Sequence, residues 1–242
     1  NDSLKQKTTW VPQLHSTVAP LFVSTFRGFG YKSEVIPLET DDSFQIGREI
    51  TRGSECLPTS TTIGAFINVL KSINANPKEH AFLMLTADGP CRFGQYSTLH
   101  RIILNRFGYN DVDIVSPSGN NSYQGLKESL RKKIFHVIVI GDILFKIACK
   151  YRPYETVKGH VDNIVNESLN LIRYNIENNL KIEDAIKKSH KLFKDLPERK
   201  KLKPLIGVVG EIYVRCNSYC NEDVIRNIEQ YGGEAWLSPI TE

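Results

Sequence analysis

The apolar run HAFLMLTA, residues 80–87, is the feature that most constrains the fold. Its length suits a strand, and a strand that is apolar on both faces is typical of the centre of a parallel sheet. Neighbouring parallel strands need crossover connections, which are usually helices. The sequence therefore has to supply helices on either side of this run.

Helices and strands do alternate around it. Strands are predicted at 8–14, 32–39 and 112–117, and helices at 16–30, around 44–50, from Pro58 onward and at 97–108. Asp41, Asp42 and Ser43 offer caps for the second helix. Pro58 suits the first turn of the third, where no N–H is needed. This order predicts an α/β fold with an open, mostly parallel sheet and helices on both faces.

Three parts of the chain differ in their pattern. Residues 1–122 are predicted to form a first α/β domain with Cys56 and Cys91, 123–200 a mainly helical connector, and 201–242 the beginning of a second, truncated α/β domain. The run IFHVIVIGDI, residues 134–143, stays open between helix and strand. Because the chain starts at Asn1 and ends within an α/β pattern, a fragment of a longer protein is expected.

Composition and missing motifs exclude several classes of function. The 242 residues are 40% hydrophobic and 24% charged, which predicts a globular cytoplasmic protein without a membrane segment. The net charge is only +4, and the basic run at 198–204 has no nucleic-acid signature beside it, so no nucleic-acid partner is expected. Phosphate-loop, dinucleotide-binding and serine-hydrolase motifs do not occur.

Two cysteines occupy positions where ligands bind in α/β proteins. Cys91 follows the apolar run in a loop that leads into a helix, and Cys56 precedes the helix that starts near Pro58. Ligands of open α/β sheets bind at the carboxyl ends of strands. The free N–H groups of a helix start stabilise a thiolate. On spacing alone, Cys56 and Cys91 are either metal ligands or small buried fillers.

The remaining cysteines and the histidines give weaker signals. Cys149 on an apolar helix is predicted to lie in the core, and Cys216 and Cys220 flank a turn where incidental placement is favoured over a shared metal. His100 follows Cys91 on its helix, and His15 lies near a strand end at the predicted crevice. A structural role is favoured for His15.

Several longer stretches together resemble a known superfamily. They are GREITRGSECLP with TTIGAF, then FLMLTADGPCRFGQY, YRPYE and GEIYVRCNSYCNEDVIRNIEQYGGEAWLSPITE. The combination resembles the activase-related proteins of the 2-hydroxyacyl-CoA dehydratase superfamily, which includes the double-cubane cluster reductases. The resemblance runs nearly end to end, and GPCRFGQY with the ECLP box is its most specific part.

The resemblance implies an iron–sulfur protein. Cys56 and Cys91 correspond to thiolate ligands of a 4Fe–4S or double-cubane cluster, with a third cysteine expected beyond residue 242. Arg92 is implied to supply positive charge or N–H donors to cluster sulfur, and Glu55 to orient substrate or its loop. The competing interpretation of both residues is a surface or loop-bracing role. A separate or fused ATP-dependent activase would supply electrons for reduction or dehydration of a substrate such as an acyl-CoA, and a homodimer is a further implied partner. The fragment alone is expected to be inactive and to lack its cluster.

Two other functions compete with this one. The first is a non-catalytic module that binds an acyl-CoA or a regulatory partner while its cysteines pack in the core. The second is an enzyme with Cys91 as nucleophile, which ranks lower because the sequence places no evident histidine base beside it.

Overall fold

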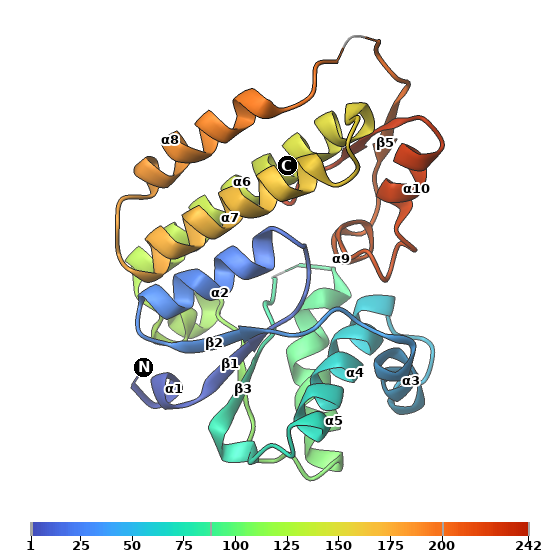
Figure 1. The fold of residues 1–242 in the computed structure, drawn as a ribbon. Helices are drawn as coiled ribbons and strands as arrows, with labels where there is room; N and C mark the ends of the chain where they lie inside the picture. The colour runs from blue at the N-terminus through green and yellow to red at the C-terminus, as the bar shows by residue number, and fades with distance from the viewer. Residues whose placement is uncertain (1, 88, 200, 242) are drawn as a thin grey trace. The chain divides into compact units, whose positions relative to one another are not determined.

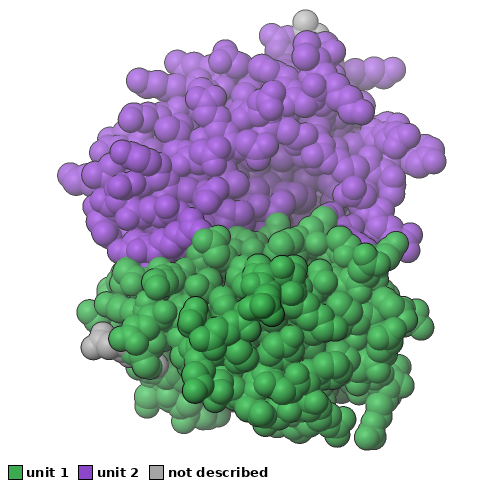
Figure 2. Space-filling view, turned by 60° about the horizontal axis from the view of Figure 1, so that its bottom comes forward, with its two compact units in different colours: residues 1–13, 29–131 green, residues 14–28, 132–242 purple. Residues whose placement is uncertain are grey.

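The structure is a computed structural model that describes residues 2–87, 89–199 and 201–241. The chain separates into two compact units, coloured in Figure 2. The first comprises residues 1–13 and 29–131, and the second comprises residues 14–28 and 132–242. Each unit is described by itself.

A parallel sheet forms the centre of the first unit. Its described strands are β1 (Thr8–Val11), β2 (Lys32–Val35), β3 (His80–Leu83) and β4 (Asp113–Val115), in the order β2-β1-β3-β4. Every pairing is parallel, and the apolar run of the sequence supplies β3, between β1 and β4. The predicted α/β fold with a parallel sheet and surrounding helices is confirmed.

Helices α4 (Leu57–Ser72) and α5 (Tyr96–Arg106) share a core with this sheet (Figure 1). Phe66 of α4 stacks on Phe82 of β3 with ring centroids 4.1 Å apart, and neither side chain is exposed. Burying a side chain of this size contributes about 2–3 kcal/mol. The shared core fixes where both helices begin.

Helix α3 (Asp41–Ile50) packs against α4 through backbone contact. The cap of α3 is Thr40, whose side chain accepts a hydrogen bond from the Ser43 N–H, while the Ser43 hydroxyl accepts one from the Thr40 N–H. Ser43 is thus the third helical residue of a capping box. The prediction of a cap within 41–43 was wrong by one residue, because the Thr40 hydroxyl takes that role.

The second unit is mainly helical. It contains α2 (Val18–Gly28), most of α6 (Glu128–Tyr151), α7 (His160–Glu177) and α8 (Ile182–Leu192). The run at 134–143 is part of α6, and its buried residue Val137 packs with Leu144 in the core of this unit. Helix α2 lies against α7, where a side chain at Gly28 would meet the Ile176 carbonyl.

A small parallel sheet completes the second unit. Strands β5 (Leu205–Val208) and β6 (Glu234–Leu237) pair over their full length, and the helices between them are α9 (Ile212–Cys216) and α10 (Val224–Gln230). Ile225 and Ala235 form a core with Cys149 of α6. In the first unit, the α-helix α1 (Asp2–Gln6) precedes β1.

The α3–α4 contact can be tested at Gly64. A Cβ atom at this position would lie 2.2 Å from the Ser43 carbonyl oxygen and 2.8 Å from the Gly47 nitrogen, so the two helices would have to separate. We expect Gly64→Ala to lower the free energy of unfolding by about 1–3 kcal/mol, as overpacking does. Urea denaturation measures the change.

The matched control is Gly119→Ala, because nothing lies within 4 Å of a Cβ atom at Gly119. Its free energy of unfolding should stay close to that of the unsubstituted chain. Equal stability of the two variants would contradict the close α3–α4 contact.

Candidate functional site

The carboxyl edge of the first sheet holds both cysteines singled out by the sequence. Strands β2 and β3 lie on opposite sides of β1, so the strand order reverses between β1 and β3. Open α/β sheets bind ligands at such a point, outside the carboxyl ends of the strands. The chain leaves β3 at this edge and reaches Cys91 before it enters α5. Helix α4 leads back to the start of β3, so its first residues lie at the same edge.

Cys56 is the N-cap residue of α4. Its side chain makes no capping hydrogen bond, and its carbonyl accepts the Thr59 N–H at 2.9 Å. The residue is half-buried against the core of the first unit. Its thiol is therefore not occupied in holding the helix start.

Cys91 is the N-cap residue of the short 3-10 helix Arg92–Gln95, which runs directly into α5. It is exposed, and its side chain makes no capping hydrogen bond. Gly94 lies so close to the preceding loop that a Cβ atom there would be 2.6 Å from the Ala87 carbonyl oxygen. Because Gly94 has no side chain, the loop can fold back beside Cys91.

Two hydrogen bonds join the segments that carry the cysteines. Arg92 donates from Nη1 to the Ser54 carbonyl at 2.9 Å, which links the residue after Cys91 to the loop before Cys56. Deeper in the unit, His100 Nε2 lies 3.3 Å from the Thr59 carbonyl. The helix starts of α4 and α5 are therefore neighbours.

Glu55 has a local partner in this loop. One carboxylate oxygen, Oε2, accepts the Arg52 N–H at 3.0 Å and closes the turn before α4. The observed contact of Arg92 also braces a loop, through Ser54. Roles of these two residues toward a cluster or substrate stay predictions.

The described residues contain no group of three or more histidine, cysteine, aspartate and glutamate side chains arranged to hold a metal ion. Cys56 and Cys91 fit an iron–sulfur cluster in the chemistry of their thiols and in their shared edge of the sheet. Together, Cys56 and Cys91 would supply two of the cysteine ligands that the resemblance implies.

His100 is a core residue. It is fully buried and stacks on Phe82 with ring centroids 5.5 Å apart. Because the partner of Nε2 is a carbonyl, we assign the proton of the neutral ring to Nε2. Burial lowers the pKa of His100 to about 4. Nε2 is bonded to the Thr59 carbonyl and Nδ1 is buried, so this ring cannot act as a base for Cys91.

His15 has a comparable environment in the second unit. Its Nδ1 accepts the Thr17 N–H at 3.3 Å, and its ring meets Phe145 edge-on at 4.4 Å. Burial lowers the pKa of His15 to about 4, although the charge of Asp142 acts in the opposite direction. The structural role favoured by the sequence agrees with these contacts.

The other cysteines lie in the second unit. Cys149 is buried in α6, as predicted, and burial raises the pKa of its thiol to about 12. Burial also raises the pKa of Cys216 to about 12. Cys220 lies in the turn after α9, where its N–H bonds to the Asn217 side chain. The buried thiols of Cys149 and Cys216 are thus held in their neutral form at ordinary pH.

The YRPYE stretch, residues 151–155, supports the second unit. The Arg152 guanidinium makes two hydrogen bonds to the Glu229 carboxylate, at 2.6 and 2.7 Å, and one to Asp162 at 2.9 Å. Burial opposes the charge of Arg152, but the bonds to Glu229 more than compensate and raise its pKa. Glu155 accepts N–H groups of Gly159 and Val161 at the start of α7.

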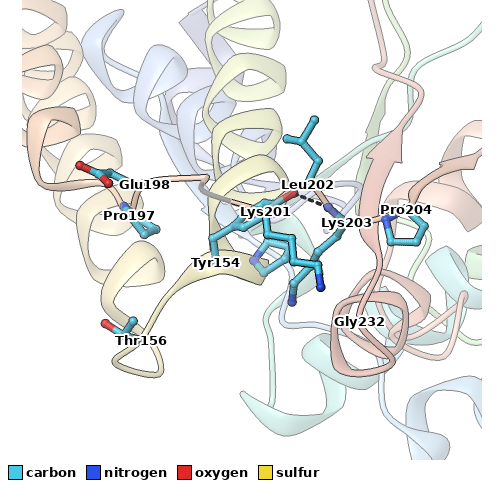
Figure 3. Close-up of a pocket in the computed structure, with 10 residues that line it drawn as sticks. Tyr154, Thr156, Pro197, Glu198, Lys201, Leu202, Lys203, Pro204 and Gly232 are labelled. Atoms are coloured by element: carbon cyan, nitrogen blue, oxygen red, sulfur yellow. Dashed lines mark hydrogen bonds between the residues drawn. The ribbon is translucent and has the colours of Figure 1, made fainter.

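A hollow of about 740 Å³ lies beside this stretch. Tyr154, Lys201, Lys203 and Pro204 are among the residues that line it (Figure 3). The Tyr154 hydroxyl accepts the Lys203 N–H at 3.0 Å and donates to Glu234 at 2.8 Å. The sequence did not single out this hollow, because its lining comes from segments far apart in the chain.

Comparisons with known proteins add no family. Neither a protein-family model, nor a curated protein, nor a solved structure matches the chain. None of the helices in the described residues is both long and apolar enough to cross a membrane.

The buried histidines predict acid sensitivity. An unfolded histidine titrates near pH 6.5, whereas His100 and His15 bind a proton only near pH 4 when folded. Between these values the unfolded chain binds more protons, so stability is full above about pH 6.5 and falls toward pH 4, by about 3 kcal/mol per histidine. Urea denaturation at about pH 7 and about pH 5 should show about 2 kcal/mol of this loss for each histidine.

His100→Gln should remove about half of this pH dependence, since His15 keeps its share. The exposed His136 provides the matched control, His136→Gln. A stability loss between the two pH values that is unchanged in His100→Gln would contradict the assignment of a neutral, buried ring.

Proposed function

We propose that this chain is an iron–sulfur component of a low-potential reductase or dehydratase system, in which Cys56 and Cys91 provide two cluster ligands. The observation that carries the proposal is the joining of the two cysteine-bearing segments by Arg92 and His100. Two thiols that are distant in sequence thereby share one edge of the sheet. A further ligand has to come from another segment or another chain.

The exposure of the cysteines supports a ligand role over simple packing. Cys91 is exposed and Cys56 is half-buried, whereas Cys149 and Cys216 are buried. A small apolar filler is expected to be buried, as these last two are.

An iron–sulfur cluster would supply one-electron chemistry at this position. The chain's own residues would set its surroundings. Arg92 keeps a positive charge beside Cys91 and holds the Cys56 loop through Ser54. The half-buried position of Cys56 would shield one side of the site, while Cys91 faces solvent, where an electron-donating partner such as an activase has access.

The proposal predicts the metal content of the protein. The chain as purified is expected to lack its cluster, so iron and sulfide have to be supplied by anaerobic reconstitution. After this treatment the unsubstituted chain should bind more iron and sulfide than Cys56→Ser or Cys91→Ser and should show brown charge-transfer absorption. We expect each substitution to remove most of the bound iron, because a single thiolate remains. Iron and sulfide assays with visible spectroscopy make the measurement.

Cys220→Ser is the matched control, since Cys220 is also half-buried but lies in the other unit. It should retain the iron of the unsubstituted chain. Equal iron in all of these proteins would contradict the proposal.

A binding module is the second candidate function. Its supporting observation is the hollow beside Tyr154, where Lys201 and Lys203 offer positive charge to an anionic group such as the phosphates of an acyl-CoA. Binding of coenzyme A without any specific binding of iron would favour this module over the iron–sulfur component.

A further inference from the structure

The loop that follows β4 has an unusual backbone. Ser122, Tyr123 and Gln124 have φ angles of 50°, 54° and 50°, so three successive residues other than glycine adopt the left-handed conformation. A Cβ atom disfavours this backbone by about five- to thirtyfold per residue. Such strain persists only where surrounding contacts hold it, and it is concentrated at ligand clamps and switch segments.

Two side-chain amides of this loop hold Ser116, the first residue after β4. Gln124 Oε1 accepts the Ser116 N–H at 2.8 Å, and Asn121 Nδ2 donates to the Ser116 carbonyl at 2.8 Å. The Asn121 amide is fixed in turn, because its Oδ1 accepts the Ser118 N–H at 2.9 Å. The strained turn therefore closes onto the end of β4.

The two amides cover the outer edge of β4. The Val115 carbonyl accepts the Met84 N–H at 2.9 Å, so Val115 faces β3 and the backbone of Ser116 faces away from it. In the described sheet β4 is the last strand on this side. The side chains of the loop thus bond to Ser116 where a further strand would do so.

The Ser116 hydroxyl has no comparable contact. Ser116 is 8% exposed, and among the described residues its Oγ is buried without a hydrogen-bond partner. A buried hydroxyl that is left unsatisfied destabilises the conformation that buries it. The closed loop therefore carries two costs, which are the left-handed turn and this hydroxyl.

Ser116 lies at the same edge and on the same face of the sheet as the candidate site. Because Pro117 follows it, Ser116 favours an extended backbone, and its side chain points to the same face as that of Ile114. Ile114 packs against the core that the sheet shares with α4 and α5. Both helices begin at the carboxyl edge, which is where Ser116 follows β4.

We propose that residues 118–125 form a latch that opens to give a ligand at the candidate site access to Ser116. Opening returns the turn to ordinary backbone angles and releases the Ser116 N–H and carbonyl from the two amides. It also exposes the hydroxyl, so the open state suits a ligand group that both donates and accepts hydrogen bonds. The latch goes beyond the proposed function, because it needs no cluster and can be tested in the metal-free chain.

Opposing interactions keep the two states of the latch close in free energy. The two amide bonds favour the closed state, as does the stacking of Arg131 on Tyr123, with the Arg131 Cζ 3.7 Å from the ring centroid. The left-handed turn and the unpartnered Ser116 hydroxyl favour the open state. We therefore expect the open state to hold about 0.1–10% of the molecules, as minor conformations do.

Hydrogen exchange of the Ser116 amide measures the opening. This N–H exchanges when Gln124 releases it, so we expect a protection factor of about 10–1,000, far below that of the β3 amides. Ser122→Gly should raise the protection about fivefold or more, because glycine adopts a positive φ without cost. Ser122→Ala is the matched control, since it keeps the Cβ atom and should leave the protection within about twofold.

Two substitutions of Ser116 test its side chain. Ser116→Ala should raise the protection of the amide at this position, because the unsatisfied hydroxyl is removed from the closed state. Ser116→Cys reports access, since iodoacetamide should alkylate the introduced thiol only in the open state. Adding Ser122→Gly should slow this alkylation about fivefold or more, as peptide mapping can measure.

Four results would overturn the latch. They are protection of the Ser116 amide as high as that of β3, equal protection in Ser122→Gly and Ser122→Ala, lower protection in Ser116→Ala, and alkylation of Ser116→Cys that Ser122→Gly does not slow. Because all of these measurements use the metal-free chain, their outcome is independent of whether Cys56 and Cys91 bind a cluster.

Discussion

The hydrogen bond between His100 and the Thr59 carbonyl is the interaction on which the candidate site depends. It joins α5, which follows Cys91, to the first turn of α4, which follows Cys56. Because His100 is fully buried against Phe82, the bond forms inside the same core that fixes both helices on the sheet. Arg92 repeats the connection at the surface through Ser54. A buried bond and an exposed bond thus hold two distant cysteine segments side by side.

The second unit depends on a different kind of interaction. Arg152 is buried, and its charge is balanced by Glu229 and Asp162. Removing one partner of a buried ion pair leaves an uncompensated charge, which is strongly destabilising. Tyr154 and Arg199 both contact Glu234 of β6, so the YRPYE stretch connects the long helices of this unit to its small sheet. These contacts account for the charged residues of the stretch without assigning them to catalysis.

The sequence predicted those parts of the fold that local patterns determine. The apolar run became β3, Pro58 lies in the first turn of α4, and Cys149 is in the core, because each depends on nearby residues or on a simple periodicity. The sequence left the run at 134–143 undecided between helix and strand. Its β-branched residues suit a strand, whereas the buried Val137 and Leu144 have the spacing of a helix face. The prevailing helix reflects packing inside the second unit.

Local sequence patterns could not predict the contacts that define the candidate site. Arg92 and Ser54 are 38 residues apart, and His100 and Thr59 are 41 apart. Neither pair leaves a spacing signal in the sequence. Thr40 was missed as the cap of α3 because three neighbouring residues at 41–43 offered similar side chains.

The central claim is that the thiols of Cys56 and Cys91 share one site, and a trivalent arsenical that binds two neighbouring thiols at once tests it most directly. In the reduced chain we expect one arsenic atom to bind per molecule, and this binding should disappear in either Cys56→Ser or Cys91→Ser while it persists in Cys220→Ser. Arsenic binding that survives both of the first two substitutions, or that never occurs, would contradict the shared site.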